Sequence, residues 1–304
     1  MVRQVNIACL QTSAFESASD ALDHALELAE QAVSDGAQLL LLPEYAGGLK
    51  TEGKLFAPPV YPESQHPVLA GIRQFAEQNN VWIVLGSVAV DGNDTKFHNR
   101  LYVIDADGAI RAHYNKIHLF DIELSAAQSY KESEKVLPGS EAVVVETPFG
   151  KLGLSICYDV RFPHLYRDLA HAGAELLLVP AAFTKKTGEA HWHLLNRARA
   201  IENGAYVIAP CAVGKISGGG ESYGHSLVID PWGDVLADGG ESTGVVQCII
   251  DIDKVTETRQ RIPSLSHDKP YSLNSAGHST DQSNQNQAVS STPSAPALES
   301  ETKL

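Results

Sequence analysis

Residues 152–165, with the sequence LGLSICYDVRFPHL, decide the fold of this chain. The mostly apolar first part predicts a buried strand that ends at Cys157, then a polar turn at Tyr158 and Asp159, then a helix that starts near Pro163. A cysteine at the carboxyl end of a core strand, just before a helix, is where an α/β fold places a nucleophile. The positive end of such a helix favours the thiolate. The alternative is a free cysteine that packs as a small apolar side chain.

A near copy of the next strand occurs earlier in the chain. Residues 36–43 read GAQLLLLP and residues 173–180 read GAELLLVP. Each copy follows a first strand and a helical segment, so each half predicts a β-α-β unit with parallel strands. The unit occurs twice, which indicates two related halves within one domain rather than a repeat array.

In the first half, residues 5–10 predict a strand and Ser19 is the expected cap of a helix that runs to about Ser34. Glu44 ends the second strand of this half, as Cys157 ends the first strand of the other. Because the carboxyl ends of parallel strands share one edge of a sheet, we expect these two side chains at the same edge.

The other elements follow from periodicity and turn residues, and the polar stretch 125–139 is a long irregular loop of the kind that often carries function. From residue 272 the composition changes to Ser, Asn, Gln, Thr, Pro and Ala, which predicts a disordered tail over 272–304. The expected helices are 68–78, one from about Ala190, and 253–261; the expected strands are 82–90, a hairpin of 97–104 with 110–114, 205–212, 225–230 and 244–251.

Length, composition and charge restrict the class of protein. The 304 residues are 43% apolar, enough for a large core in one domain or two small ones. The formal net charge of -14 argues against nucleic acid or an anionic membrane as a partner. The start of the chain, MVRQVNIACLQT, has no signal-peptide core, and no apolar run is long enough to span a membrane. We therefore expect a soluble, cytoplasmic protein.

The four cysteines support a reducing compartment. Cys9, Cys157, Cys211 and Cys248 lie far apart in the sequence and form no CxxC pair. This usage is typical of reduced thiols and not of a disulfide framework or a zinc knuckle.

Glu44, Lys116 and Cys157 each follow a predicted strand. Singly, Glu44 could cap a strand and Lys116 could be a solvated loop cation. Together they supply a carboxylate base, a fixed cation and a thiol, which are the parts of a nucleophilic active site.

The stretches LLLLPEY around Glu44, YNKIHLFD around Lys116 and GLSICYDVRFPHL around Cys157 resemble the nitrilase superfamily of carbon–nitrogen hydrolases, and the resemblance covers residues 2 to about 271. The segments RFP, TGEAHWHLLNRARAIEN and SYGHSLVIDPWG are most similar to the Nit branch, which includes ω-amidases and deaminated glutathione amidases. The resemblance implies a four-layer α-β-β-α sandwich with two mixed sheets and an internal pseudo-two-fold repeat. It also implies a domain over 1–271 and a homodimer or higher homo-oligomer.

The same resemblance implies a Glu44–Lys116–Cys157 triad and a second glutamate in the loop after the lysine. Glu132 in YKES fits this position, with Glu134 as the alternative. One departure is at the end of the domain, where related Nit proteins often carry two arginines and this chain has SHDKP at 266–270. Contacts inferred from relatives at that end do not transfer.

These residues permit hydrolysis of an amide. Glu44 takes the proton of Cys157, the thiolate attacks the amide carbon, and Lys116 with the backbone N–H of Tyr158 stabilises the oxyanion, at roughly 3 kcal/mol per donor. A thioester forms, and Glu44 then activates water, while Glu132 holds Lys116 or that water. The predicted reaction cleaves a small primary amide that carries a carboxylate, such as a deaminated glutathione or α-ketoglutaramate-like compound, to acid and ammonia.

Tyr158, Arg161 and His191 are the predicted substrate-binding residues. A guanidinium binds a carboxylate in bidentate fashion, although Arg161 could equally be a structural ion-pair partner. His191 and His193 form a His-x-His pair, but residues two apart on a helix face different directions and no third ligand has suitable spacing. We therefore predict that the protein uses neither a metal nor another cofactor.

Three other readings remain. A nitrilase or an N-carbamoyl amino acid hydrolase would use the same triad. A catalytically silent binding module would have no chemical need for all three residues. A thiol redox protein would need a resolving cysteine near Cys157, and none is near in sequence.

Overall fold

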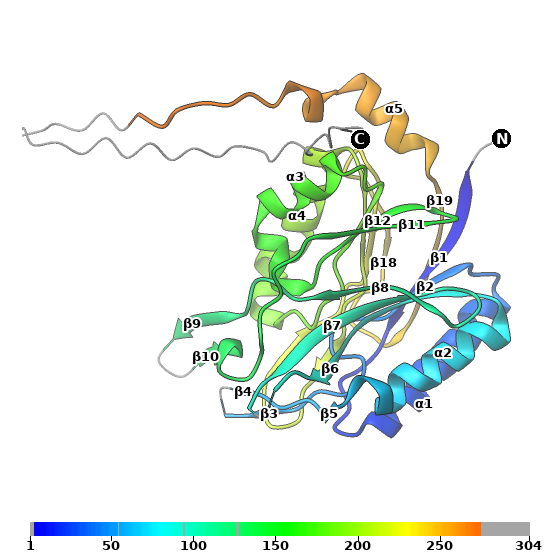
Figure 1. Ribbon diagram of the computed structural model, residues 1–304, viewed down its shortest axis with the longest axis vertical. Coiled ribbons are helices and arrows are strands. Elements are labelled where there is room, and N and C mark those ends of the chain that lie inside the picture. The colour runs from blue at the N-terminus through cyan, green and yellow to red at the C-terminus, as the bar shows by residue number, and fades with distance from the viewer. Residues whose placement is uncertain (1–2, 54, 94, 126–127, 275–304) are drawn as a thin grey trace, which may run out of the picture. The chain divides into compact units, whose positions relative to one another are not determined.

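A computed structural model describes residues 3–53, 55–93, 95–125 and 128–274. The chain divides into a compact unit over residues 1–265 and a second unit over 266–304. In the first unit two large β-sheets are stacked, and pairs of helices lie on their outer sides (Figure 1). The helices are α1 (Ala18–Ser34), α2 (Pro67–Asn79), α3 (Pro163–His171), α4 (Lys185–Asn203) and α5 (Asp253–Arg261), with 3-10 turns η1 (Glu63–Gln65), η2 (Glu132–Glu134), η3 (Cys157–Arg161) and η4 (Ser264–His267).

The first sheet has the strand order β19-β1-β2-β6-β7-β8, with β5 beside β6. The second has the order β11-β12-β13-β14-β17-β18. The strands of the first sheet are β1 (Gln4–Gln11), β2 (Leu39–Leu41), β5 (Val60–Tyr61), β6 (Trp82–Asp91), β7 (Phe97–Ile104), β8 (Ile110–Asn115) and β19 (Gly244–Asp251). Those of the second are β11 (Val143–Thr147), β12 (Gly150–Leu154), β13 (Leu176–Leu178), β14 (Tyr206–Ala209), β17 (Leu227–Ile229) and β18 (Val235–Asp238). Three small ribbons are β3 (Thr51–Glu52) with β4 (Leu55–Phe56), β9 (Asp121–Ser125) with β10 (Gln128–Lys131), and β15 (Val213–Lys215) with β16 (Glu221–Tyr223).

The two sheets repeat one pairing pattern. Reading along either order, the successive pairs are antiparallel, parallel, parallel, antiparallel and antiparallel. The predicted internal repeat, the mixed sheets and the parallel β-α-β units are therefore confirmed. The expectation that Glu44 and Cys157 share the edge of one sheet is wrong, because Glu44 follows β2 of the first sheet and Cys157 follows β12 of the second.

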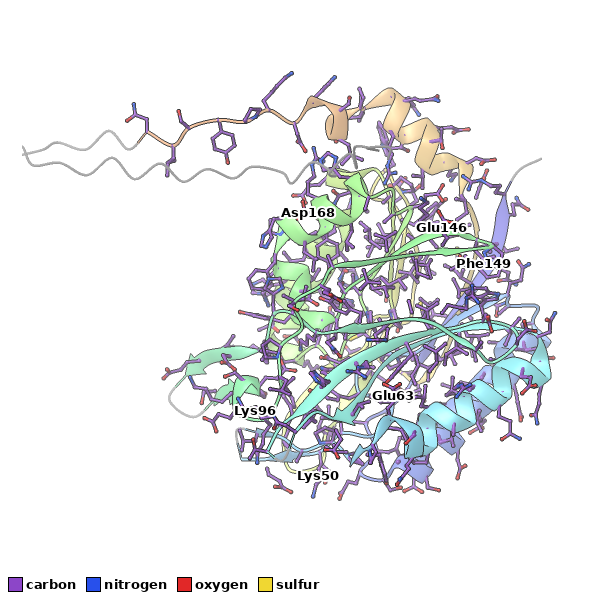
Figure 2. The ribbon with its side chains drawn as sticks, viewed as in Figure 1. Lys50, Glu63, Lys96, Glu146, Phe149 and Asp168 are labelled. Carbon is purple, nitrogen blue, oxygen red and sulfur yellow. The ribbon has the colours of Figure 1, made fainter. Side chains whose placement is uncertain are left out.

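Alternation along the strands explains why the sheets stack. In β1, Ile7 and Cys9 face the apolar core between the sheets, while Ala8 and Leu10 face the core under α1 and α2. At the turn of the β11–β12 hairpin, Phe149 (Figure 2) packs edge-on against Trp82 of the first sheet, with ring centroids 6.2 Å apart. Both faces of the first sheet are thus buried, as the continuous apolar strands require.

Several predicted boundaries differ from the structure. The cap of α1 is Ser17 and not Ser19, because the Ser17 side chain accepts a hydrogen bond from the N–H of Asp20. Strand β12 ends at Leu154, before the predicted end at Cys157. Helix α4 begins at Lys185, earlier than the predicted start at about Ala190.

The early start of α4 includes Gly188, which the sequence suggested as a loop residue. A side-chain carbon there would lie 2.3 Å from the ring of Tyr223, so this glycine serves close packing inside a helix. The polar stretch 125–139 was predicted to be an irregular loop, but it contains part of the β9–β10 ribbon and the turn η2.

Helices α3 and α4 differ in how much apolar surface they expose. On α3, Leu165, Tyr166 and Leu169 are all buried, so they leave no apolar patch. On α4, Leu194 is 70% exposed and Ile201 is 52% exposed, and their spacing of seven places them on one side of the helix.

Within the described residues no helix has both the length and the apolar character that would carry it across a membrane. The four cysteines are all free thiols. The predicted tail begins at residue 272, and most of it, residues 275–304, lies outside the described residues; the division at residue 271 stays a prediction.

Candidate active site

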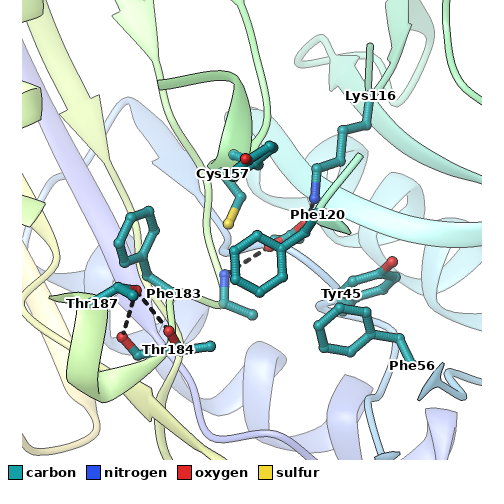
Figure 3. A pocket seen from close by; sticks show the side chains of 11 residues that line it. Tyr45, Phe56, Lys116, Phe120, Cys157, Phe183, Thr184 and Thr187 are labelled. Atoms are coloured by element: carbon teal, nitrogen blue, oxygen red, sulfur yellow. Dashed lines mark hydrogen bonds and ion pairs between the residues drawn. The ribbon is translucent and has the colours of Figure 1, made fainter. Parts of the chain in front are cut away.

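A narrow pocket opens where loops from both sheets meet (Figure 3). Glu44 and Tyr45 follow β2, Lys116 follows β8, and Cys157 begins η3 just after β12. The pocket brings together the three residues that the sequence singled out. Its lining residues are Glu44, Tyr45, Phe56, Lys116, Phe120, Cys157, Tyr158, Ala182, Phe183, Thr184 and Thr187.

Lys116 lies between two carboxylates. Its Nζ is 2.8 Å from Glu44 Oε1, 2.9 Å from Glu132 Oε2 and 3.1 Å from Glu132 Oε1. All three residues are almost fully buried. One ammonium faces two carboxylates, so the cluster has a formal excess of one negative charge. Glu132 therefore belongs to the cluster, whereas the alternative Glu134 is exposed.

Other groups hold the two carboxylates in place. Glu44 Oε2 accepts a hydrogen bond of 2.9 Å from the N–H of Ala182, and Glu44 Oε1 accepts one of 2.9 Å from Asn99 Nδ2. Glu132 accepts hydrogen bonds from the N–H of Phe120 (2.6 Å) and the hydroxyl of Tyr45 (3.1 Å). These donors fix the orientation of both carboxylates.

Cys157 has an unusual backbone conformation. Its φ is 49°, in the left-handed region that residues other than glycine rarely adopt, and its N–H donates to the Pro180 carbonyl at 2.9 Å. Such a turn at a reactive residue is one that the surrounding contacts must impose. The side chain points into the pocket (Figure 3), which Glu44 and Lys116 also line.

The electrostatics of the thiol differ from the sequence prediction. Burial raises the pKa of the Cys157 thiol well above its ordinary value, the charge of Glu44 raises this pKa further, and Lys116 opposes both effects only in part. Lys116 therefore favours the thiolate, but burial and the charge of Glu44 outweigh it. The helix α3 begins only at Pro163, and only the short turn η3 lies at the cysteine.

Lys116 remains charged in this setting. Burial alone would lower the pKa of Lys116, but Glu132 and Glu44 outweigh it and raise that pKa well above its ordinary value. The pocket thus holds a neutral thiol next to a fixed cation and a carboxylate.

Asp159 holds the turn that carries the cysteine. Its Oδ2 accepts hydrogen bonds of 2.8 Å from the N–H of Ile156 and from the hydroxyl of Tyr114. Its Oδ1 accepts one of 3.0 Å from the N–H of His118. These contacts connect the turn at residues 157–159 to the segment that follows Lys116.

The three predicted substrate-binding residues lie at different depths. Tyr158 lines the pocket, and its backbone N–H, at the first turn of η3, has no acceptor among the described residues. Arg161 lies outside the lining, with its guanidinium 5.8 Å from the Tyr158 ring centre and 5.5 Å from that of Phe183. His191 is exposed and lies with Nδ1 3.3 Å from Arg161 Nη2.

A set of possible metal ligands lies outside the pocket lining, and it includes one histidine of the His-x-His pair. His193 Nε2 and His225 Nδ1 contact the two oxygens of Asp238 at 3.0 and 2.8 Å. The sequence reasoning found no third ligand because His225 and Asp238 come from a distant segment. In this arrangement both imidazoles already share one carboxylate, and His191 takes no part.

Asn99, Tyr45 and Asp159 were missed as site residues. Asn99 interrupts the apolar strand FHNRLYVI, and a polar residue at a buried position could have marked it. Tyr45 and Asp159 lie close to Glu44 and Cys157 in the sequence, but sequence spacing does not predict which groups their side chains contact.

The sequence model of the carbon–nitrogen hydrolase family matches residues 4–260. A deaminated glutathione amidase from Dictyostelium discoideum is 41% identical over 254 residues, which cover 80% of this chain and 86% of that protein.

Two solved structures are similar along most of the chain. The C. elegans NitFhit protein has a TM-score of 0.79 and 36% identity, over 88% of this chain and 65% of that one, so this chain spans about two thirds of it. A mutant amidase from Nesterenkonia sp. AN1 has a TM-score of 0.69 and 26% identity, over 85% of this chain and 98% of that one. In that amidase acrylamide has added to the active site cysteine.

Proposed function

This chain belongs to the carbon–nitrogen hydrolase family, and we propose that it is an amidase that works through a thioester on Cys157. The observation that carries the proposal is that the buried ion pair Lys116–Glu44 and the Cys157 thiol line the same pocket. The name of the Dictyostelium relative and the cysteine adduct of the Nesterenkonia amidase support the same reaction class.

The acylation step begins from a neutral thiol. As Cys157 Sγ bonds to the amide carbon, its proton passes to Glu44, which lines the same pocket. Glu44 then gives the proton to the leaving amine, the carbon–nitrogen bond breaks, and the thioester remains.

The oxyanion needs donors that are fixed before the reaction. The free N–H of Tyr158 and the ammonium of Lys116 are the two candidates, and removal of one such donor typically costs about 2.7–4 kcal/mol in the transition state. Glu132 holds Lys116 for this role. In deacylation Glu44 removes a proton from water, which attacks the thioester and releases the acid and the thiol.

The proposed substrates are small amides that carry a carboxylate, and deaminated glutathione is the first candidate because the relatives bear that name. Glutathione is a tripeptide, so its deaminated form has peptide amides and its hydrolysis would release an amine. An α-ketoglutaramate-like primary amide would instead release ammonia. Both leaving groups need the same proton from Glu44.

The substrate class is tested by product formation from a panel. Wild-type protein should hydrolyse deaminated glutathione faster than α-ketoglutaramate, an N-carbamoyl amino acid or a simple nitrile. If the nitrile were the preferred substrate, the protein would be a nitrilase and not an amidase. If the carbamoyl compound were preferred, it would be an N-carbamoyl amino acid hydrolase.

The nucleophile is tested by substitution and mass spectrometry. Cys157→Ala and Cys157→Ser should abolish turnover and keep the fold, and wild-type protein with a slow substrate should carry an acyl group on Cys157. Acylation of Cys9, Cys211 or Cys248, with activity that survives Cys157→Ala, would refute the mechanism.

We also propose a homodimer or higher homo-oligomer in the cytoplasm. The exposed Leu194 and Ile201 on α4 favour a partner on that helix, since a soluble protein rarely leaves such a patch bare. The free thiols favour a reducing compartment.

A further inference from the structure

The pocket at Cys157 is too small for a whole peptide-like amide. Its volume is about 10 Å³, roughly the space that the centre of one water molecule needs. The reacting group alone fits at Cys157, so the remainder of such a substrate has to lie outside.

The pocket also lacks a cation for a substrate carboxylate. Among the described residues that line it, Lys116 is the single cation, and Glu44 and Glu132 already neutralise it. The other lining side chains are mostly aromatic or apolar, with the hydroxyls of Thr184 and Thr187 at one wall. A substrate carboxylate therefore needs a partner elsewhere.

A larger hollow of about 620 Å³ adjoins this pocket. Thr184 lines both cavities. Tyr130 lines the hollow and stacks on Phe56 of the pocket, with ring centroids 5.7 Å apart and planes 17° apart, and it packs on Phe120 at 5.2 Å. The hollow thus lies directly beside the pocket.

Lysines gather in this hollow although the chain as a whole is acidic. Lys185 is engaged, because its Nζ lies 3.0 Å from Glu221 and 3.4 Å from Glu241. Lys186 and Lys215 also line the hollow, are exposed, and form no ion pair with any described residue. Glu189 is the one lining carboxylate without such a pair in the described part of the chain.

We infer that this hollow binds the carboxylate at the far end of the substrate through Lys186 and Lys215. The inference rests on the proposed amidase function and names the part of the substrate that is read. An ammonium is a compact donor on a flexible stem, so two of them can follow a carboxylate at the end of a mobile leaving group. The far carboxylate of deaminated glutathione, at the end of its leaving dipeptide, is a ligand of this kind.

The test compares two substrates and two double variants. The substrates are deaminated glutathione and the same compound with its terminal carboxylate capped as an N-methylamide. The variants are Lys186→Met with Lys215→Met, and, as a control of equal charge change, Lys151→Met with Lys254→Met, which lie outside the hollow.

Wild-type protein and the control should prefer the uncapped substrate by roughly three- to tenfold in kcat/KM, and added salt should reduce this preference. The variant with Lys186→Met and Lys215→Met should hydrolyse both substrates with the same kcat/KM. A preference that persists in this variant, or none in the wild type, would overturn the inference.

A binding measurement separates this inference from the proposed function. Calorimetry on Cys157→Ala should show tighter binding of the uncapped compound, and loss of that difference when Lys186 and Lys215 are also replaced. Selective binding without turnover by the wild type would refute the proposed function and keep the hollow as a carboxylate site. Turnover by the wild type without selective binding would keep the proposed function and refute the hollow as a carboxylate site.

Discussion

Replacement of Glu132 tests most clearly whether a residue supports the reaction by holding Lys116 in place and not by reacting itself. Every polar neighbour of its carboxylate is a donor: the ammonium of Lys116, the N–H of Phe120, the hydroxyl of Tyr45 and the amide of Asn99. Glu132→Gln keeps the shape but adds an NH2 group that must face one of these donors.

The magnitude follows from burial. Breaking one partner of a buried ion pair typically costs about 3–5 kcal/mol, and the pair here has virtually no solvent access. Because Lys116 keeps Glu44 as a partner at 2.8 Å, we expect the lower end, about 3 kcal/mol, in the free energy of unfolding. A domain with 5–15 kcal/mol of stability would still fold. We expect kcat to fall by roughly 10- to 100-fold, less than the loss of an oxyanion donor itself.

The pH profile gives a readout that a purely structural role would not move. Glu132 helps to raise the pKa of Lys116, and a raised lysine pKa stabilises the fold and the cation until the pH rises through that folded-state value. Glu132→Gln lowers the pKa of Lys116, so the alkaline decline of kcat should move to lower pH.

The assay is kcat against pH, with thermal unfolding in parallel, and Glu134→Gln serves as the control because Glu134 is an exposed glutamate on the same turn. Unchanged kcat and pH profile in Glu132→Gln, or an equal loss in Glu134→Gln, would refute the reasoning.

Three further outcomes are expected. Lys116→Ala should lower kcat by about 100- to 1000-fold, because the charge that it stabilises exists only in the transition state; a change in KM alone would contradict its oxyanion role. Gly86→Ala should destabilise the fold by about 1–3 kcal/mol in chemical denaturation, because its side-chain carbon would lie 1.9 Å from the Leu42 carbonyl oxygen just before Glu44. Gly71→Ala, whose three nearest atoms all belong to the flexible Leu22 side chain, is the matched control and should cost less. Light scattering should give a mass well above the monomer's 32.7 kDa, and a fully active monomer would reject the oligomer.

The sequence by itself determined the plan of the chain. The paired segments at 36–43 and 173–180 specify two β-α-β units, because hydrophobic periodicity and Gly and Pro turns act over a few neighbouring residues. The positions of Glu44, Lys116 and Cys157 directly after strand-like runs marked them as candidate site residues, and the resemblance to the nitrilase superfamily grouped them as a triad.

Only the tertiary structure decided which sheets supply the residues and how the site is charged. Glu44 and Cys157 approach from different sheets, and Asn99 completes the cluster from the middle of a strand. The direction of the pKa shift of Cys157 does not follow from the sequence, because a pKa depends on burial and on distances to charges across the fold. Sequence order sets neither quantity: they arise only when two separately specified sheets pack and exclude water from the charges between them.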